Sequence, residues 1–254
     1  MDSFYSSLKP DLFSAKRVLC IQPHYDDNDI FCGGTIARLR DLGAEIIYLT
    51  VTDDLVGVLD QSLSDEQMTA QLRAEQLQAG ADIGVASQYW LGYPDAGDYS
   101  YHQLRTDILG YLRLLRPDFV ITVDPWLPYE IHHDHILTGQ AASEAVFLVG
   151  FTRLKTKPEI DQNYSPHEIK GIAYYNSAWP NQVVDISQTV ARKHKALFAY
   201  RAQFSEADLL ILDQETEINA SKAAQGQPFS HAEAIKVVHP AQLHGNVETW
   251  RSQV

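Results

Sequence analysis

Short apolar runs alternate along the chain with longer segments whose apolar residues recur at helical spacing. The runs typical of buried strands cover residues 17–24, 44–52, 88–93 and 119–123. Between them, residues 29–42, 64–84 and 101–115 carry the period of amphipathic helices. Gly43 stands where a glycine commonly ends a helix, and Ser64 is a suitable N-cap for the second helix. The pattern predicts a regular alternation of strand and helix.

The rest of the chain continues this pattern less clearly. It predicts a helix over 136–149, strands over 172–175 and 183–186, a helical run over 187–204 and mixed helical character over 206–226, with a long loop at 152–167. Near-continuous apolar strands that alternate with helices indicate a mainly parallel sheet covered on both faces, a Rossmann-like α/β sandwich. We found no repeat or linker. We therefore expect one domain over 1–254, with a core at 17–204 and a C-terminal extension, 205–254, packed on it.

Composition narrows the classes of function. Apolar residues make up 45% of the 254 and charged residues 21%, which is ordinary globular usage. A chain of this length can fold without disulfide bonds or structural metal ions, so a bound metal is expected to take part in catalysis. The net charge of −13 disfavours nucleic acid and anionic membranes as partners. With two cysteines, no signal-like start and no long apolar segment, we expect a cytoplasmic protein with no transmembrane segment.

Groups able to bind a metal gather after three of the predicted strands. The first strand leads into PHYDDND, the second into TDD and the fourth into DPWLPYEIHHDH. In open parallel sheets, ligands bind beyond the carboxyl ends of the strands. The first and fourth strands flank the switch point of a doubly wound sheet, so these clusters are expected to converge.

A catalytic zinc site uses about three protein ligands and leaves one position for water. His24 and Asp27 lie on one strand-to-helix turn that can aim both at one point, and His135 could supply a third ligand. Asp26, beside this pair, could accept a proton from the water. In the simplest alternative, Asp26 or Asp29 is a helix N-cap.

These residues resemble the PIG-L or LmbE-like N-acetylglucosaminyl deacetylases, whose two metal motifs correspond to PHYDDN and HHDH here. The segments LGYPDAGDY, LRLLRPDFVIT and KALFAYRAQF are similar to further parts of the family pattern, so the resemblance reaches from Val18 to Phe204. It implies a zinc-dependent hydrolase in which water attacks an acetamide carbonyl and releases acetate and an amine. The substrate would be a small N-acetylated amino sugar.

The resemblance also implies roles for single residues. His24, Asp27 and His135 would be the zinc ligands and Asp26 the general base. Protonated His132, oriented by Asp134, would stabilise the oxyanion and then protonate the leaving amine. Arg73, in QLRAEQ, matches an arginine near the substrate pocket.

Three positions depart from the family pattern. Tyr25 replaces a proline, Asn28 replaces a glutamate, and Asp54 stands where a glycine is frequent. Asn28 is expected to alter activity or specificity, because residues that support metal ligands commonly contribute ~10–100-fold to affinity or activity. Asp54 is expected to reshape the substrate pocket.

Two other functions stay open at this stage. A nucleotide-binding Rossmann-type enzyme, such as a methyltransferase, could use Asp53 or Asp54 on a ribose, but PHYDDND stands where a glycine-rich turn is required. A non-catalytic metal- or sugar-binding family member is the second alternative, suggested by Asn28. Trp126, Tyr129 and Trp179 could stack on a sugar face or serve as ordinary packing. A homo-oligomer is possible.

Overall fold

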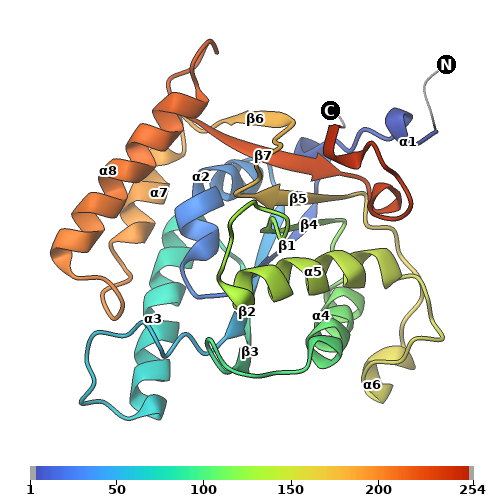
Figure 1. Cartoon of the computed structure of the whole chain (residues 1–254), viewed down its shortest axis with the longest axis horizontal. Coiled ribbons are helices and arrows are strands. Elements are labelled where there is room, and N and C mark those ends of the chain that lie inside the picture. Colours follow the sequence, from blue (N-terminus) through green and yellow to red (C-terminus); the bar gives the residue numbers. More distant parts are fainter. Residues whose placement is uncertain (1–3, 252–254) are drawn as a thin grey trace.

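Seven strands form one sheet in the order β3-β2-β1-β4-β5-β7-β6 in the computed structural model, which describes residues 4–251 (Figure 1). Strand β7 runs antiparallel to its neighbours β5 and β6, and the other neighbouring pairs are parallel. The mainly parallel α/β fold is therefore confirmed. The strands are β1 (Arg17–Gln22), β2 (Glu45–Thr52), β3 (Ser87–Tyr93), β4 (Phe119–Val123), β5 (Gly171–Tyr175), β6 (Gln182–Asp185) and β7 (Ala232–Val238).

Helices cover both faces of this sheet (Figure 1). One face is covered by α2 (Asp27–Asp41), α3 (Asp65–Ile83), α7 (Val190–Leu197) and α8 (Glu206–Ala223), and the other by α4 (Tyr101–Leu115) and α5 (His133–Leu148). Shorter helical turns are α1 (Phe4–Ser7), η1 (Leu12–Ser14), α6 (Pro158–Asp161), η2 (Pro240–Leu243) and η3 (Thr249–Arg251). Between residues 4 and 251, no helix is both long and apolar enough to cross a membrane.

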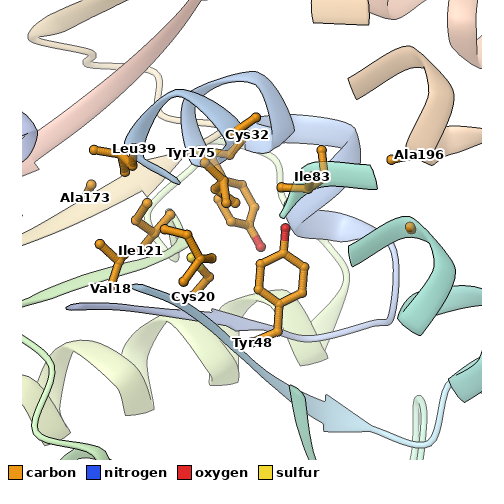
Figure 2. Close-up of a cluster of buried hydrophobic side chains, with 14 of the residues drawn as sticks. Val18, Cys20, Cys32, Leu39, Tyr48, Ile83, Ile121, Ala173, Tyr175 and Ala196 are labelled. Carbon is orange, nitrogen blue, oxygen red and sulfur yellow. The ribbon is translucent and has the colours of Figure 1, made fainter. Parts of the chain in front are cut away.

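The core between the sheet and α2 is assembled from several strands at once (Figure 2). Val18, Tyr48 and Ile121 come from three strands and are fully buried, as is Cys32 of α2. Cys20 and Cys32 are free, buried thiols in this core. Burial of these apolar side chains fixes α2 across the sheet and so fixes the position of its first turn.

The C-terminal part of the sheet differs from the prediction. Residues 232–238 form β7, which pairs with two strands, although no strand was expected there. Glu233 and Lys236 interrupt the apolar run in the sequence, yet both are buried because the fold supplies partners. Glu233 accepts the backbone N–H groups of Gly34 and Thr35 and the ammonium of Lys193. The expected helix over 187–204 is shortened to α7, and the loop at 152–167 contains α6.

Helices α2 and α5 both begin earlier than the pattern predicts, at Asp27 and His133 instead of 29 and 136. Their first turns contain polar, metal-capable residues, which apolar periodicity does not detect. Asp26 occupies the N-cap position of α2 but makes no side-chain capping hydrogen bond. Asp29 is no cap either, because its carboxylate accepts the hydroxyl groups of Tyr48 and Tyr200.

Candidate metal and active site

The polar clusters that follow β1, β2 and β4 meet at one edge of the sheet. β1 lies between β2 and β4 and is parallel to both, so their carboxyl ends lie side by side. The rings of His24, His132 and His135 have centroids 4.6–5.2 Å apart. Residues separated by more than 100 positions in the sequence thus form one group.

His24, Asp27 and His135 each offer one donor atom, and these three atoms lie within 4.8 Å of one another. Nδ1 of His24 is 3.3 Å from Oδ2 of Asp27, and Nε2 of His135 is 3.4 Å from Oδ1 of Asp27. Ligands of a tetrahedral zinc at 2.0–2.1 Å are roughly 3.3–3.4 Å from one another. All three residues have buried or nearly buried side chains, and all three offer the nitrogen or oxygen donors that a catalytic metal uses. The residues present therefore fit a metal ion.

A carboxylate faces the second ring nitrogen of each of these histidines. Oδ1 of Asp95 is 3.3 Å from Nε2 of His24, and Oε2 of Glu130 is 3.4 Å from Nδ1 of His135. Metal-binding histidines usually direct their other nitrogen at a carboxylate or carbonyl, which fixes the ring and its tautomer. Asp95 and Glu130 thus complete the arrangement around the His/Asp/His group.

Asp134 joins this group to His132 from the first turn of α5. Its carboxylate accepts the backbone N–H of Ala96 at 2.8 Å and the hydroxyl of Tyr99 at 2.7 Å. Oδ2 of Asp134 also lies 3.6 Å from Nε2 of His24 and 3.9 Å from Nδ1 of His132. His24, Asp95, His132 and Asp134 form a second set able to hold a metal. We favour the first set, because both oxygens of Asp134 already accept hydrogen bonds.

The dense charges shift the protonation of the site. Burial, and then the charges of Asp27 and Asp54, raise the pKa of Asp26 well above its ordinary value. Burial alone would lower the pKa of His24, but hydrogen bonding to Asp134, Asp27 and Asp95 raises it overall. Burial and the charges of His24 and His135 lower the pKa of His132, whose side chain is 43% exposed. These carboxylates concentrate negative charge where a cation would bind.

Asp54 lies in the wall of the site, behind the turn that carries the first motif. Its backbone has φ = 59°, in the left-handed region that favours glycine, which explains why a glycine is frequent at this position. Its buried carboxylate accepts the backbone N–H of Tyr25 at 3.0 Å and Nε2 of Gln203 at 2.7 Å. Asp54 therefore ties the PHYDD turn to the segment after α7.

Arg73 lies at an exposed position of α3. Its guanidinium lies 5.0 Å from the ring centroid of Trp90 and also hydrogen bonds to the phenol of Tyr25. Arg73 thus contacts the residue that follows His24. Asn28, at the position of the usual glutamate, is fully buried, and its side-chain amide has no hydrogen-bond partner within residues 4–251.

Sequence reasoning gave no role to Asp95, Tyr99 or Glu130. Asp95 and Tyr99 lie in LGYPDAGDY, which was recognised only as a similar segment, and Glu130 lies two residues before His132. The sequence does show acidic residues near the two motifs. Only the folded structure shows which histidine each carboxylate faces.

A buried His/Asp/His group lies at the edge of an α/β sheet, beside Asp26, whose carboxylate caps no helix. Such a site defines the class of metal-dependent hydrolases. Comparisons with known proteins identify the family. The family described as GlcNAc-PI de-N-acetylase (PIG-L) matches residues 19–146. The chain belongs to this family. It is a deacetylase, a hydrolase that acts on an amide carbon–nitrogen bond.

Relatives and solved structures agree with this assignment. The chain is 34% identical over 229 residues to diacetylchitobiose deacetylase of Thermococcus kodakarensis, which covers 90% of this chain and 85% of that protein. The solved N,N′-diacetylchitobiose deacetylase of Pyrococcus horikoshii superposes with a TM-score of 0.86 at 34% identity, over 95% of this chain and 90% of that one.

A more distant relative is 1D-myo-inositol 2-acetamido-2-deoxy-alpha-D-glucopyranoside deacetylase of Rhodococcus erythropolis. It is 31% identical over 158 residues, which is 52% of this chain and 53% of that protein. The comparisons give no support to the nucleotide-binding alternative.

Proposed function

We propose that this protein is a zinc-dependent deacetylase of N-acetylglucosamine-type saccharides, with N,N′-diacetylchitobiose as the first substrate to test. The 34% identity to diacetylchitobiose deacetylase over 90% of the chain supports this substrate class. The observation that supports the metal assignment is the convergence of one donor atom each from His24, Asp27 and His135 within 4.8 Å of one another. A zinc ion there would polarise the acetamide carbonyl and acidify the attacking water.

Asp26 is proposed as the general base. It is the residue next to the ligand Asp27, it is buried, and its carboxylate caps no helix. A base needs an acceptor oxygen within reach of the water and not engaged elsewhere. Asp26 would take the proton of the attacking water.

His132 is proposed to act on the other side of the carbonyl. The side chain of His132 is partly exposed, so substrate can reach it, whereas the neighbouring Asp134 is buried. Burial and the charges of His24 and His135 lower the pKa of His132, and the charge of Asp134 opposes this effect only in part. In its protonated form His132 would stabilise the developing oxyanion and then supply a proton to the amine.

The remaining proposed site residues shape the substrate pocket. Asp54 would hold Tyr25 and Gln203 in place, so its effect on substrate acts through these two groups. Arg73 would contact substrate from the side of Tyr25 and Trp90. Cytoplasmic location and homo-oligomer formation stay predictions from the sequence.

Two aspartate variants test the proposal together. Asp26→Asn should keep its zinc and lose ~10²–10⁴-fold in the rate of acetate release from N,N′-diacetylchitobiose, because only the base is removed. Asp27→Asn should lose zinc, measured by elemental analysis of the purified protein. Unchanged turnover in Asp26→Asn would remove it from the mechanism. Full zinc occupancy in Asp27→Asn would refute the ligand set.

A further inference from the structure

Three of the four tryptophans in the chain line one cavity outside the His/Asp/His group. Its volume is about 580 Å³, within the range of small-molecule sites. Trp126 comes from the β4–α5 segment, Trp179 from the β5–β6 loop and Trp250 from η3. Three separate segments thus bring an indole to the same place.

The indoles are unusually accessible for such large apolar groups. Trp126 and Trp250 are 50% exposed and Trp179 is 38% exposed. The ring of Trp126 is held edge-on against Tyr174, with centroids 5.7 Å apart. Clustered exposed aromatics with fixed orientation mark binding sites more often than isolated ones do. An indole combines a flat apolar face with one N–H donor, which suits a ligand with both apolar and hydroxyl surface.

Two buried residues of opposite charge type, one acidic and one basic, line the cavity. Asp124 is 3% exposed and Lys236 is 6% exposed, and both line the cavity. Asp124 accepts the backbone N–H of Trp126, and Lys236 donates to the backbone oxygen of Trp250. The opposite charges balance, so the cavity favours a neutral, polar ligand over an anion or a cation.

The cavity is linked to the catalytic site by the chain itself. Asp124 and Trp126 begin the segment between β4 and α5 that goes on to Glu130, His132 and His135. A ligand held at Trp126 therefore contacts the first residues of the segment that also carries His132.

We propose that the cavity formed by Trp126, Trp179, Trp250, Asp124 and Lys236 is an accessory binding site for a neutral pyranose ring of an N-acetylated saccharide. The flat faces of the indoles stack on the ring, and the buried charges accept and donate hydrogen bonds to its hydroxyl groups. The choice of an N-acetylated saccharide rests on the proposed function, but the site itself is separate from the metal-capable residues.

The four indole N–H groups provide the test. The zinc-loaded Asp26→Asn protein, labelled with ¹⁵N, is titrated with N,N′-diacetylchitobiose, and the indole signals are followed by NMR. Trp90 lies outside the cavity and reports binding beside Arg73, because it contacts Arg73 and its Nε1 donates to Gln76 at 2.5 Å. We expect saturable shifts of Trp126, Trp179 and Trp250.

Several outcomes overturn the proposal. One is a shift of Trp90 alone, which places the saccharide beside Arg73 and not in the cavity. Another is no shift of the three cavity indoles at about 10 mM saccharide, well above a millimolar Kd. Cavity shifts that follow protein concentration instead of saccharide would show that a second copy of the chain covers this face. Because turnover is not measured, failure of the proposed deacetylase activity would not by itself abolish these shifts.

A matched pair of variants locates the binding. Trp179→Leu should weaken the saccharide affinity about 2- to 10-fold, the contribution expected of one aromatic contact. Phe151→Leu, at an exposed aromatic outside the cavity, should leave it unchanged. Retained signals of the other indoles show that Trp179→Leu is folded. Equal affinities of the two variants would contradict the proposal.

Discussion

Oε2 of Glu130 lies 3.4 Å from Nδ1 of His135, and Oε1 of the same side chain accepts the backbone N–H of His132 at 2.8 Å. One carboxylate thus contacts His132 and His135, two of the three histidines of the second motif. It is positioned by the preceding residue, Tyr129, whose φ of 68° turns the chain sharply at this point. Glu130 therefore connects the geometry of the proposed ligand to that of the proposed acid.

Glu130→Gln should lower zinc affinity by ~10–100-fold, because the amide no longer stabilises the His135 ring as a ligand. Competition with a chromophoric chelator measures this directly. Glu159→Gln, at an exposed position of α6, is the control and should retain the parent affinity. Equal affinities in the two variants would show that Glu130 has no role in holding His135.

His132→Ala should reduce turnover of N,N′-diacetylchitobiose by ~10²–10⁴-fold while the zinc content stays at the parent level. The reason is that His132 borders the His/Asp/His group without being one of its members. His135→Ala provides the contrast and should lose zinc. If His132→Ala lost zinc and His135→Ala kept it, the two roles would have to be exchanged.

Gly139→Ala should destabilise the fold by about 1–3 kcal/mol, the usual cost of an extra methyl in a packed position. A Cβ at Gly139 would lie 2.6 Å from the backbone oxygen of Val123, so α5 would have to move away from β4. Gly110→Ala, in α4, meets neighbours only at 3.6 Å or more and should stabilise the protein instead. Urea unfolding of both variants measures the difference, and destabilisation of equal size would contradict it.

Asp118 should contribute to stability at neutral pH but not in acid. Burial alone would raise its pKa, but the backbone N–H groups of Arg17 and Lys16 and the ammonium of Lys170 hold it below the ordinary value. A carboxyl whose pKa is lower in the folded state stabilises the fold above about pH 4 and loses this effect as the pH falls through the folded pKa. Asp118→Asn should cost about 1 kcal/mol in urea unfolding at pH 7. The destabilisation caused by Asp118→Asn should vanish near pH 2. An equal destabilisation at pH 7 and pH 2 would exclude the charge of Asp118 as its cause.

Much of the fold could be predicted because parallel strands are buried on both faces and therefore carry near-continuous apolar runs. β1, β2 and β4 were located in this way, and the capping box at Ser64 marks the start of α3 as expected. β7 could not be predicted, because the partners that make Glu233 and Lys236 tolerable in a strand come from α2, α7 and η3. The local sequence pattern cannot predict contacts with residues so distant in the chain.

The candidate site divides in the same way. The chemical types at His24, Asp26, Asp27, His132, Asp134 and His135 follow from two short motifs, since a metal site requires specific donors at specific spacings. Asp95 and Glu130 could not be assigned from the sequence, because an acidic residue in a loop is most often only solvated. Their significance comes from distances of 3.3 and 3.4 Å to two different histidines.

The sequence by itself determined the kinds of side chain that perform the chemistry and the alternation of strands and helices that carries them. Only the tertiary structure decided which carboxylate faces which histidine, that Asp54 braces Tyr25, and that three tryptophans share a cavity. The physical reason is the difference in sequence range between the two kinds of interaction. Backbone propensity and periodicity act over a few residues, whereas these contacts depend on the strand order of the sheet, which brings distant loops to one edge.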